Sequence, residues 1–271
     1  MKTILLHIEN EDDLTVRIEN GLSLARAASA HLSCLRVTPV EAFVSFDSFG
    51  GVFVMSNVMA ALDKQEQSVR AKAEAELENE DVSWDYTQVT GNVVTRLAGA
   101  GALADLIVTA REMDQGKASG ASLGMLGNLL HRARTPLFVP GTAPQPCDPK
   151  GTALIAWDGS FEAANAVRNS IGLLRLAAGV RVARVEEQKD DGFPDTRLLE
   201  FLSRHGIHAK QTLLPLEGDD IATTILRHAQ NLGASYVVMG GYSHSRTGEY
   251  LFGGVTRRLL SDSPVGIVIA R

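Results

Sequence analysis

Short apolar runs alternate along the whole chain with longer stretches that place apolar residues at helical spacing. The apolar runs are rich in β-branched residues at successive positions, which is typical of buried parallel strands. Strands that alternate with helices predict an α/β fold with doubly wound, Rossmann-like parallel sheets. The helices are predicted at residues 13–30, 58–79, 92–102, 122–133, 161–177, 195–206, 219–232 and 254–262.

The pattern of strands and helices occurs twice. TILLHI at residues 3–8 matches TALIAW at residues 152–157, and each is followed by polar residues and an alanine-rich helical stretch. TPLFV at residues 135–139 likewise matches SPVGI at residues 263–267. A repeat of this length predicts two tandem domains of the same fold.

A proline-rich segment separates the two copies. Residues 141–150 contain three of the nine prolines of the chain, which favours a linker over a helix or a strand. We therefore predict one domain at residues 1–144 and a second at residues 145–271. We also predict that the final strands of the two copies, Leu137–Val139 and Gly266–Ala270, lie together where the domains pair, because paired edge strands are protected from aggregation.

Composition argues against two classes of protein, general nucleic-acid binders and membrane-spanning proteins. The chain has 271 residues, 45% of them hydrophobic, and a net charge of −6, which argues against a general nucleic-acid binder. No apolar stretch reaches the ~20 residues of a membrane span, and the chain starts directly with a strand-like run. We therefore expect a cytoplasmic protein. Cys34 and Cys147 lack metal-ligand spacing, and we interpret them as a buried apolar residue and an incidental linker residue.

The most informative stretch is the last strand–loop–helix–strand unit. Gly240 and Gly241 end an apolar run at residues 236–239, and Gly253 and Gly254 come just before a helical pattern. Glycines let a backbone approach a ligand closely, and a helix start offers free N–H groups and partial positive charge. This arrangement suits a phosphate group, although the spacing fits neither the Walker motif nor G-x-G-x-x-G.

The stretch resembles the nucleotide-binding end of the universal stress protein family. ATP-binding members carry Gly, two residues, Gly, nine residues, and then Gly followed by Ser or Thr. Gly240 and Gly253 occupy the first and last glycine positions. Ser243 stands where the second Gly is usual, Gly254 stands where Ser or Thr is usual, and Thr256 follows two residues later.

The resemblance implies an adenine-nucleotide site in the second copy, for ATP, ADP or AMP, with Mg²⁺ accompanying the triphosphate. Asp158, after the first strand of this copy, would hydrogen-bond ribose or adenine; the alternative is that it caps the next helix. The implied contact residues are Ala156 and Trp157 at the base, Asp158, Val185 through its backbone, Met239 and Gly240 under base and ribose, and Gly241, Ser243, His244, Ser245, Arg246, Gly253, Gly254, Val255 and Thr256 towards the phosphates.

The first copy matches this pattern poorly. Glu9 takes the place of Asp158, and Ala110 and Arg111 take the places of the two glycines after the fourth strand. Arg111 would put a bulky side chain near ribose or phosphate. We therefore expect one competent site per chain. Because single-domain members of the family commonly form dimers, the resemblance implies that the two domains pair within the chain, while a homodimer stays an open alternative.

Three functions remain in view. The first is a nucleotide-binding stress-response protein with, at most, slow ATP hydrolysis. The second is an interaction protein of the same fold that binds no nucleotide, which the Ser243 and Gly254 departures allow. The third is an enzyme that adenylates a substrate or cleaves ATP. It is disfavoured because residues 158–160 lack the Ser-Gly-Gly loop of such folds. In addition, no acidic pair, metal-ligand cluster or nucleophile elbow surrounds His244 in the sequence.

Two further segments of the first copy carry expectations. The stretch at residues 41–56 holds four phenylalanines, and it either folds over the protein's own core, forms a dimer contact or covers a ligand. The helical stretch at residues 59–80 reads as a solvated amphipathic helix, with Glu66 and Arg70 spaced to form an ion pair.

Overall fold

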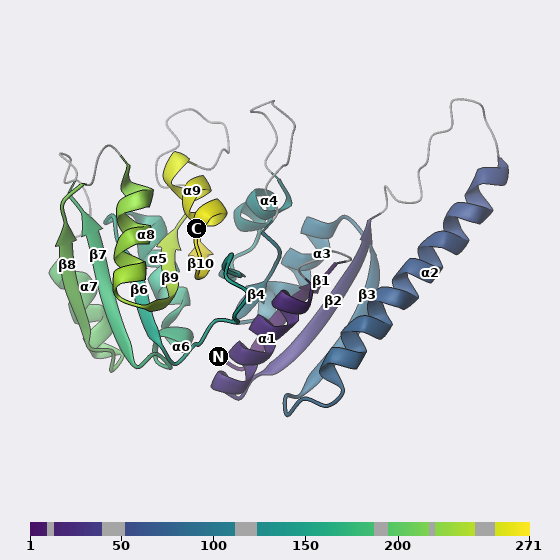
Figure 1. Ribbon diagram of the computed structural model, residues 1–271, viewed down its shortest axis with the longest axis horizontal. Helices are drawn as coiled ribbons and strands as arrows, with labels where there is room; N and C mark the ends of the chain where they lie inside the picture. Colours follow the sequence, from purple (N-terminus) through teal and green to yellow (C-terminus); the bar gives the residue numbers. More distant parts are fainter. Residues whose placement is uncertain (10–13, 40–51, 112–123, 187–194, 217–219, 242–252) are drawn as a thin grey trace.

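The computed structural model describes residues 1–9, 14–39, 52–111, 124–186, 195–216, 220–241 and 253–271. Within them, ten strands form one sheet in the order β3-β2-β1-β4-β5-β10-β9-β6-β7-β8 (Figure 1). The first half of the sheet comprises β1 (Thr3–Ile8), β2 (His31–Pro39), β3 (Trp84–Gly91), β4 (Leu106–Val108) and β5 (Leu137–Val139). The second half comprises β6 (Thr152–Ala156), β7 (Gly179–Val185), β8 (Ala209–Leu214), β9 (Ala234–Gly240) and β10 (Gly266–Ala270).

Each half has the strand order of a doubly wound sheet. Neighbouring strands within a half are parallel, and the order read inward from the outer edge is β3-β2-β1-β4-β5 in one half and β8-β7-β6-β9-β10 in the other. In each half, the second and third strands lie on one side of the first strand, and the fourth and fifth lie on its other side. The strand order therefore switches between the neighbours β1 and β4, and again between β6 and β9. Ligands bind at such switch points, outside the carboxyl ends of the strands. The predicted α/β fold class is confirmed.

Helices cover both faces of the sheet. One face is buried under α1 (Leu14–Ala28), α2 (Val52–Leu77), α5 (Phe161–Asn169), α6 (Ile171–Leu174) and α7 (Asp195–Arg204). The other is buried under α3 (Val93–Ala100), the 3-10 turn η2 (Gly101–Leu103), α4 (Met125–Arg132), α8 (Ile221–Asn231) and α9 (Gly254–Asp262). Alternate residues of each strand enter the two cores, because side chains of a strand point to opposite faces in turn.

The halves of the sheet meet where β5 and β10 pair as antiparallel strands, with Phe138 opposite Val268. Phe138 is fully buried, and its ring lies against the backbone of Gly266: a Cβ built on that glycine would stand 2.4 Å from the ring Cζ. Because Gly266 has no side chain, the ring of Phe138 in β5 can pack directly over the backbone of β10. The two final strands that the sequence singled out are thus neighbours in the sheet.

The proline-rich segment at residues 141–150 is tied to helix α1 of the first half. The backbone N–H of Cys147 donates to Asn20 Oδ1 over 2.9 Å, and Ser23 Oγ donates to the Cys147 carbonyl over 2.7 Å. Cys147 is itself buried in the core, so the interpretation of an incidental linker residue was wrong. Cys34 is buried as predicted, and burial raises the pKa of both thiols to about 12.

Helix α2 departs from its expected surface role. Glu66 is buried and pairs with Arg36 of β2, while Arg70 pairs with Glu74 instead of Glu66. The helix begins at Val52, inside the phenylalanine-containing stretch; residues 41–51 of that stretch lie outside the described residues. Among the helices that the structure describes, none combines the length and apolar character of a membrane span.

Candidate functional site

The switch point between β6 and β9 brings together the strand ends that the sequence predicted as a site. The two strands are parallel neighbours, with Ala156 opposite Met239, and β7 flanks β6 on its other side. Asp158 follows β6 and Gly241 follows β9, so both lie at the carboxyl edge of the second half. Val185 ends β7 at the same edge.

Three of the predicted base-contacting residues share one face of the sheet, and one does not. Ala156, Val185 and Met239 belong to the face covered by α8 and α9, and the first two are only half-buried. Trp157 points to the opposite face, where it packs in the core beneath α5 with 5% of its surface exposed. The indole N–H of Trp157 has no acceptor among the described residues. The structure therefore does not bring Trp157 together with the other three.

Asp158 is exposed in a tight turn between β6 and α5. Its Oδ1 accepts hydrogen bonds from the Ser160 N–H over 2.9 Å and from Ser160 Oγ over 2.6 Å. Gly159 between them has φ +76°, in the left-handed region that glycine tolerates. The helix cap is Ser160, whose Oγ accepts from the Ala163 N–H over 3.1 Å. Asp158 thus orients the cap and is not the cap itself, and its Oδ2 makes no hydrogen bond within the described residues.

The glycines of the candidate site fall into two kinds. Gly240 and Gly241 are needed for packing: a Cβ on Gly240 would stand 2.4 Å from the backbone nitrogen of Ala163, and one on Gly241 would stand 2.7 Å from Leu130 Cδ2. Gly253 and Gly254 are exposed, and a Cβ on either would meet nothing within 4 Å.

The glycine pair at residues 253–254 opens helix α9 without a side-chain cap. Gly253 is the N-cap residue of this helix and Gly254 is its first residue. The first N–H groups of a helix have no partner inside it, and this end also carries the positive end of the helix dipole. Val255 is half-buried and Thr256 is buried to 8% exposure. Ser243, His244, Ser245 and Arg246 lie outside the described residues.

The equivalent place in the first half is filled by side chains. In the alignment of the two copies His7 stands where Ala156 stands, and Thr109 stands where Met239 stands. Both His7 and Thr109 have 0% exposure, and their Nδ1 and Oγ1 atoms are 3.5 Å apart. Arg17, also fully buried, donates to the His7 carbonyl over 3.0 Å, and its NH1 lies 3.6 Å from Glu9 Oε2.

His7 is kept neutral by its surroundings. Burial lowers its pKa well below the usual 6.5, and the nearby charges of Arg17 and Arg36 lower it further. Glu9 Oε1 lies 3.6 Å from His7 Nε2. Sequence reasoning missed this histidine, although a histidine within an otherwise apolar strand run was a visible signal. The sequence predicts that Arg111 obstructs this place; its guanidinium instead reaches the carbonyls of Ser261 and Ser263 in the second half and that of Pro140 in the first.

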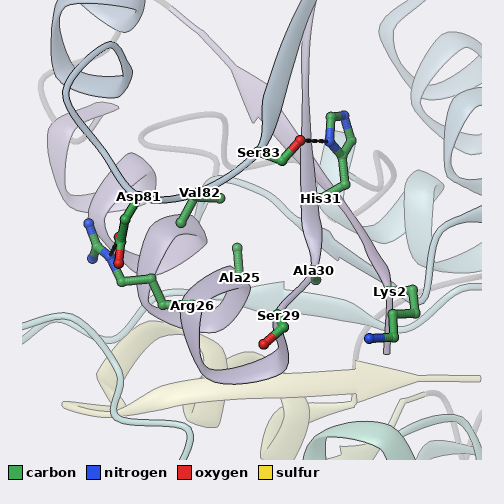
Figure 2. A pocket seen from close by; sticks show the side chains of 9 residues that line it. All are labelled: Lys2, Ala25, Arg26, Ser29, Ala30, His31, Asp81, Val82 and Ser83. Atoms are coloured by element: carbon green, nitrogen blue, oxygen red, sulfur yellow. Dashed lines mark hydrogen bonds and ion pairs between the residues drawn. The ribbon is translucent and has the colours of Figure 1, made fainter.

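A cavity of about 520 Å³ lies elsewhere, at the amino ends of β1–β3 in the first half. Figure 2 shows its lining, with Lys2, Arg26 and His31 around Ser29 and Ser83. Arg26 is paired with Glu80 and Asp81, and His31 bonds to Ser83 and Asp85. Arg26 and His31 are thus engaged with neighbouring protein groups. The described residues contain no cluster of three His, Cys, Asp or Glu side chains that could hold a metal ion.

Comparison with known families finds one match, which lies in the second half of the chain. Residues 151–271 match the family model described as "Universal stress protein family". Residues 151–271, the second half of this chain, are thus similar in sequence to the universal stress protein family. The match begins at the residue before β6 and ends with the chain, so it includes both strand ends of the candidate site and helix α9.

Solved structures extend the likeness in fold to the whole chain. A universal stress protein from Archaeoglobus fulgidus DSM 4304 aligns over 99% of this chain and 96% of its own, with a TM-score of 0.73 and 16% sequence identity. A functionally unknown protein from Pseudomonas aeruginosa PAO1 aligns over 100% of this chain and 92% of its own, with a TM-score of 0.56 and 18% identity. At such identities the likeness concerns the fold alone. A search of curated proteins found no match.

Proposed function

We propose that the protein is a stress-response protein that binds ATP or another adenine nucleotide at one site, in a domain formed by residues 145–271. Residues 1–144 then form a related domain that keeps the fold without a competent site. The family match over residues 151–271 supports the nucleotide assignment. The proposed role is to sense or sequester the nucleotide, in the cytoplasm, with slow hydrolysis at most.

In the proposed complex the base lies on the sheet face that carries Ala156, Val185 and Met239. Ala156 is small and half-buried there, and from the family resemblance we propose that a backbone group of Val185 contacts adenine. Asp158 then binds ribose or adenine through its free Oδ2, because a carboxylate accepts hydrogen bonds from hydroxyl groups and from the exocyclic amine.

The phosphates are proposed to lie at the start of α9. The exposed Gly253 and Gly254 leave the first-turn N–H groups accessible, and partial positive charge at a helix N-terminus favours anions. Val255 and Thr256 continue this turn. From the family resemblance we propose that Ser243, His244, Ser245 and Arg246 approach the same phosphates, and that Mg²⁺ accompanies a bound triphosphate.

The observation that carries the proposal of a single site is the contrast between the two switch points. In the first half the fully buried imidazole of His7 stands where the second half has the small, half-buried Ala156, whereas Thr109 and its counterpart Met239 are both buried. A base cannot enter a space that packed side chains already occupy. The same contrast predicts a stoichiometry of one nucleotide per chain.

Isothermal titration calorimetry with ATP tests the proposal. We expect one site per chain, and Asp158→Ala should weaken binding by about 1–3 kcal/mol because a charged hydrogen-bond acceptor is lost. Asp158→Asn keeps an oxygen acceptor for Ser160 and therefore keeps the turn, but it removes the charge. Comparing the two variants separates the effect of a disturbed turn from the effect of a lost ligand contact. Glu9→Gln, the equivalent change in the first half, is the matched control and should leave the affinity unchanged.

Other outcomes of the titrations would contradict the proposed function or the single site. Absence of binding at millimolar ATP would favour the alternative of an interaction protein without nucleotide. Two bound nucleotides per chain, or equal losses in Asp158→Ala and Glu9→Gln, would contradict the single site. Native mass spectrometry of freshly purified protein reports the assembly size and any retained nucleotide together, and so also tests for a homodimer.

A further inference from the structure

Arg111, in the first half, binds three backbone carbonyl groups around the end of helix α9. Its NH1 donates to the Ser261 carbonyl over 3.0 Å, and its NH2 donates to the carbonyls of Pro140 over 2.6 Å and Ser263 over 3.2 Å. Arg111 follows β4 and Pro140 follows β5, whereas Ser261 and Ser263 belong to the second half. One guanidinium therefore joins the two halves.

Two of the three bound carbonyls, those of Ser261 and Ser263, lie at the end of a helix, and the Ser263 carbonyl also accepts from the Thr142 N–H over 2.9 Å. Ser261 lies in the last turn of α9, and Ser263 is its C-cap residue. The last four carbonyls of a helix accept no bond inside it, and a positive charge near this end is favourable to the helix dipole. A planar guanidinium with five N–H donors meets several such acceptors at once, which an ammonium group does less well.

The first half also supports the other end of the proposed phosphate site. Leu130 of α4 packs against Gly241, close enough that a Cβ on the glycine would stand 2.7 Å from Leu130 Cδ2. Gly241 follows β9, directly before the stretch that leads to the start of α9. The first half thus contacts the elements around the proposed site of the second half at two places: at the C-terminal end of α9 and at Gly241.

We propose that Arg111 is a positioning residue for nucleotide binding in the second half, an inference that rests on the proposed function. Helix α9 has nine residues, so it is about 14 Å long and moves as one body. By fixing the C-terminal end of α9, Arg111 sets where the amides of Gly254 and Val255 stand relative to Asp158. The first half then contributes to phosphate binding without touching the ligand.

Other contacts keep α9 folded when Arg111 is removed. Leu259 and Leu260 have 0% exposure in the core, and Arg258 NH1 pairs with Asp220 Oδ2 of α8 over 2.7 Å. Loss of Arg111 therefore shifts or loosens the helix without unfolding it. This predicts a selective effect, because the phosphates depend on α9 and the nucleoside depends on β6, β7 and β9.

Calorimetric titrations with ATP and with adenosine test the inference. For Arg111→Ala we expect ATP affinity to fall about tenfold, the equivalent of one ordinary hydrogen-bonded contact, with adenosine affinity unchanged. Arg111→Lys should give an intermediate loss, because one ammonium reaches fewer of the three carbonyls. Arg96→Ala is the matched control, since Arg96 is an exposed arginine of the same half that also donates to a carbonyl, that of Thr90 over 3.2 Å.

Each outcome decides between the two proposals. Wild-type protein that binds neither ligand overturns the proposed function and this inference with it. Wild-type protein that binds ATP, together with an Arg111→Ala variant that binds it equally well, overturns this inference alone, as do parallel losses for ATP and adenosine. If Arg111→Ala does not fold, Arg111→Gln, whose planar amide still donates to a carbonyl, is measured in its place against the same criteria.

Discussion

Arg36 of β2 and Glu66 of α2 form a buried ion pair with two parallel hydrogen bonds. Arg36 Nε donates to Glu66 Oε2 and Arg36 NH2 to Glu66 Oε1, each over 2.8 Å, and the side chains are 8% and 9% exposed. The pair fixes the long helix α2 against the sheet near the end of β2. Arg36 also donates to the Ile8 carbonyl over 3.4 Å, so it reaches the neighbouring strand.

Breaking this pair from one side should destabilise the fold strongly. Glu66→Ala leaves a buried guanidinium without its counter-charge, and we expect the free energy of unfolding to fall by about 3–5 kcal/mol. Replacing both partners, as in Arg36→Met with Glu66→Leu, removes both charges and should cost much less. Urea denaturation followed by circular dichroism measures these differences.

The exposed pair of the same helix supplies the control for that prediction. Arg70 and Glu74 are 2.8 Å apart with side chains 53% and 38% exposed, so Glu74→Ala should change stability by less than about 1 kcal/mol. A loss for Glu66→Ala no larger than that for Glu74→Ala would contradict the structural role given to the buried pair.

The sequence was sufficient for the order of the strands and helices, because the strand and helix periods were clear. It was not sufficient for the partner of Glu66. Spacing along a helix identifies neighbours on its surface, here Arg70, but a residue that faces the sheet finds its partner in a distant strand. Arg36 is thirty positions away, and only the packing of α2 over β2 brings the two together.

Only part of the candidate site could be predicted, again because packing is not visible in the sequence. Strand ends at the switch point follow from topology, so Asp158, Val185 and Gly240 were placed correctly at one edge. Adjacent residues of a strand face opposite sides, however, so Ala156 and Trp157 could not both line one pocket. Gly240 was predicted to lie under base and ribose, whereas its close backbone approach to α5 has no signal in the sequence and is visible only in three dimensions.

The two kinds of glycine predict opposite outcomes for the same substitution. Gly240→Ala forces a Cβ to within 2.4 Å of the Ala163 nitrogen and 2.7 Å of the Glu162 carbonyl carbon, both backbone atoms that cannot rotate away. We expect destabilisation by about 1–3 kcal/mol, as for overpacking in a core. Gly254→Ala meets nothing within 4 Å and improves helix propensity, so stability should stay equal or rise by up to about 1 kcal/mol.

Denaturation midpoints of the two variants, measured side by side, test this assignment. The two changes are chemically identical, so effects common to any Gly→Ala substitution in the unfolded chain cancel in the comparison. Equal effects on stability would mean that β9 and α5 do not approach as closely as the structure indicates.

Stability in mild acid should depend on His7. Burial, with the charges of Arg17 and Arg36, lowers the pKa of His7 well below 6.5 in the folded protein, so the unfolded chain binds the proton first as pH falls. The stabilisation present above pH 6.5 is therefore lost progressively below it, by up to about 1.4 kcal/mol per pH unit until the folded pKa is reached. Between pH 7.5 and 5.0 the loss is therefore at most about 2 kcal/mol.

Comparison with His7→Gln isolates this contribution, because the carboxylates that also titrate in this range are common to both proteins. Urea denaturation at pH 7.5, 6.5, 5.5 and 5.0 should give a free energy of unfolding that falls more steeply for the wild type than for the variant, and the two curves should diverge only below about pH 6.5. His208→Gln, which removes an exposed histidine, should follow the wild-type dependence. Parallel curves for wild type and His7→Gln would mean that His7 takes up a proton as readily in the folded protein as in the unfolded chain, and would remove the argument that a neutral, packed imidazole fills the first switch point.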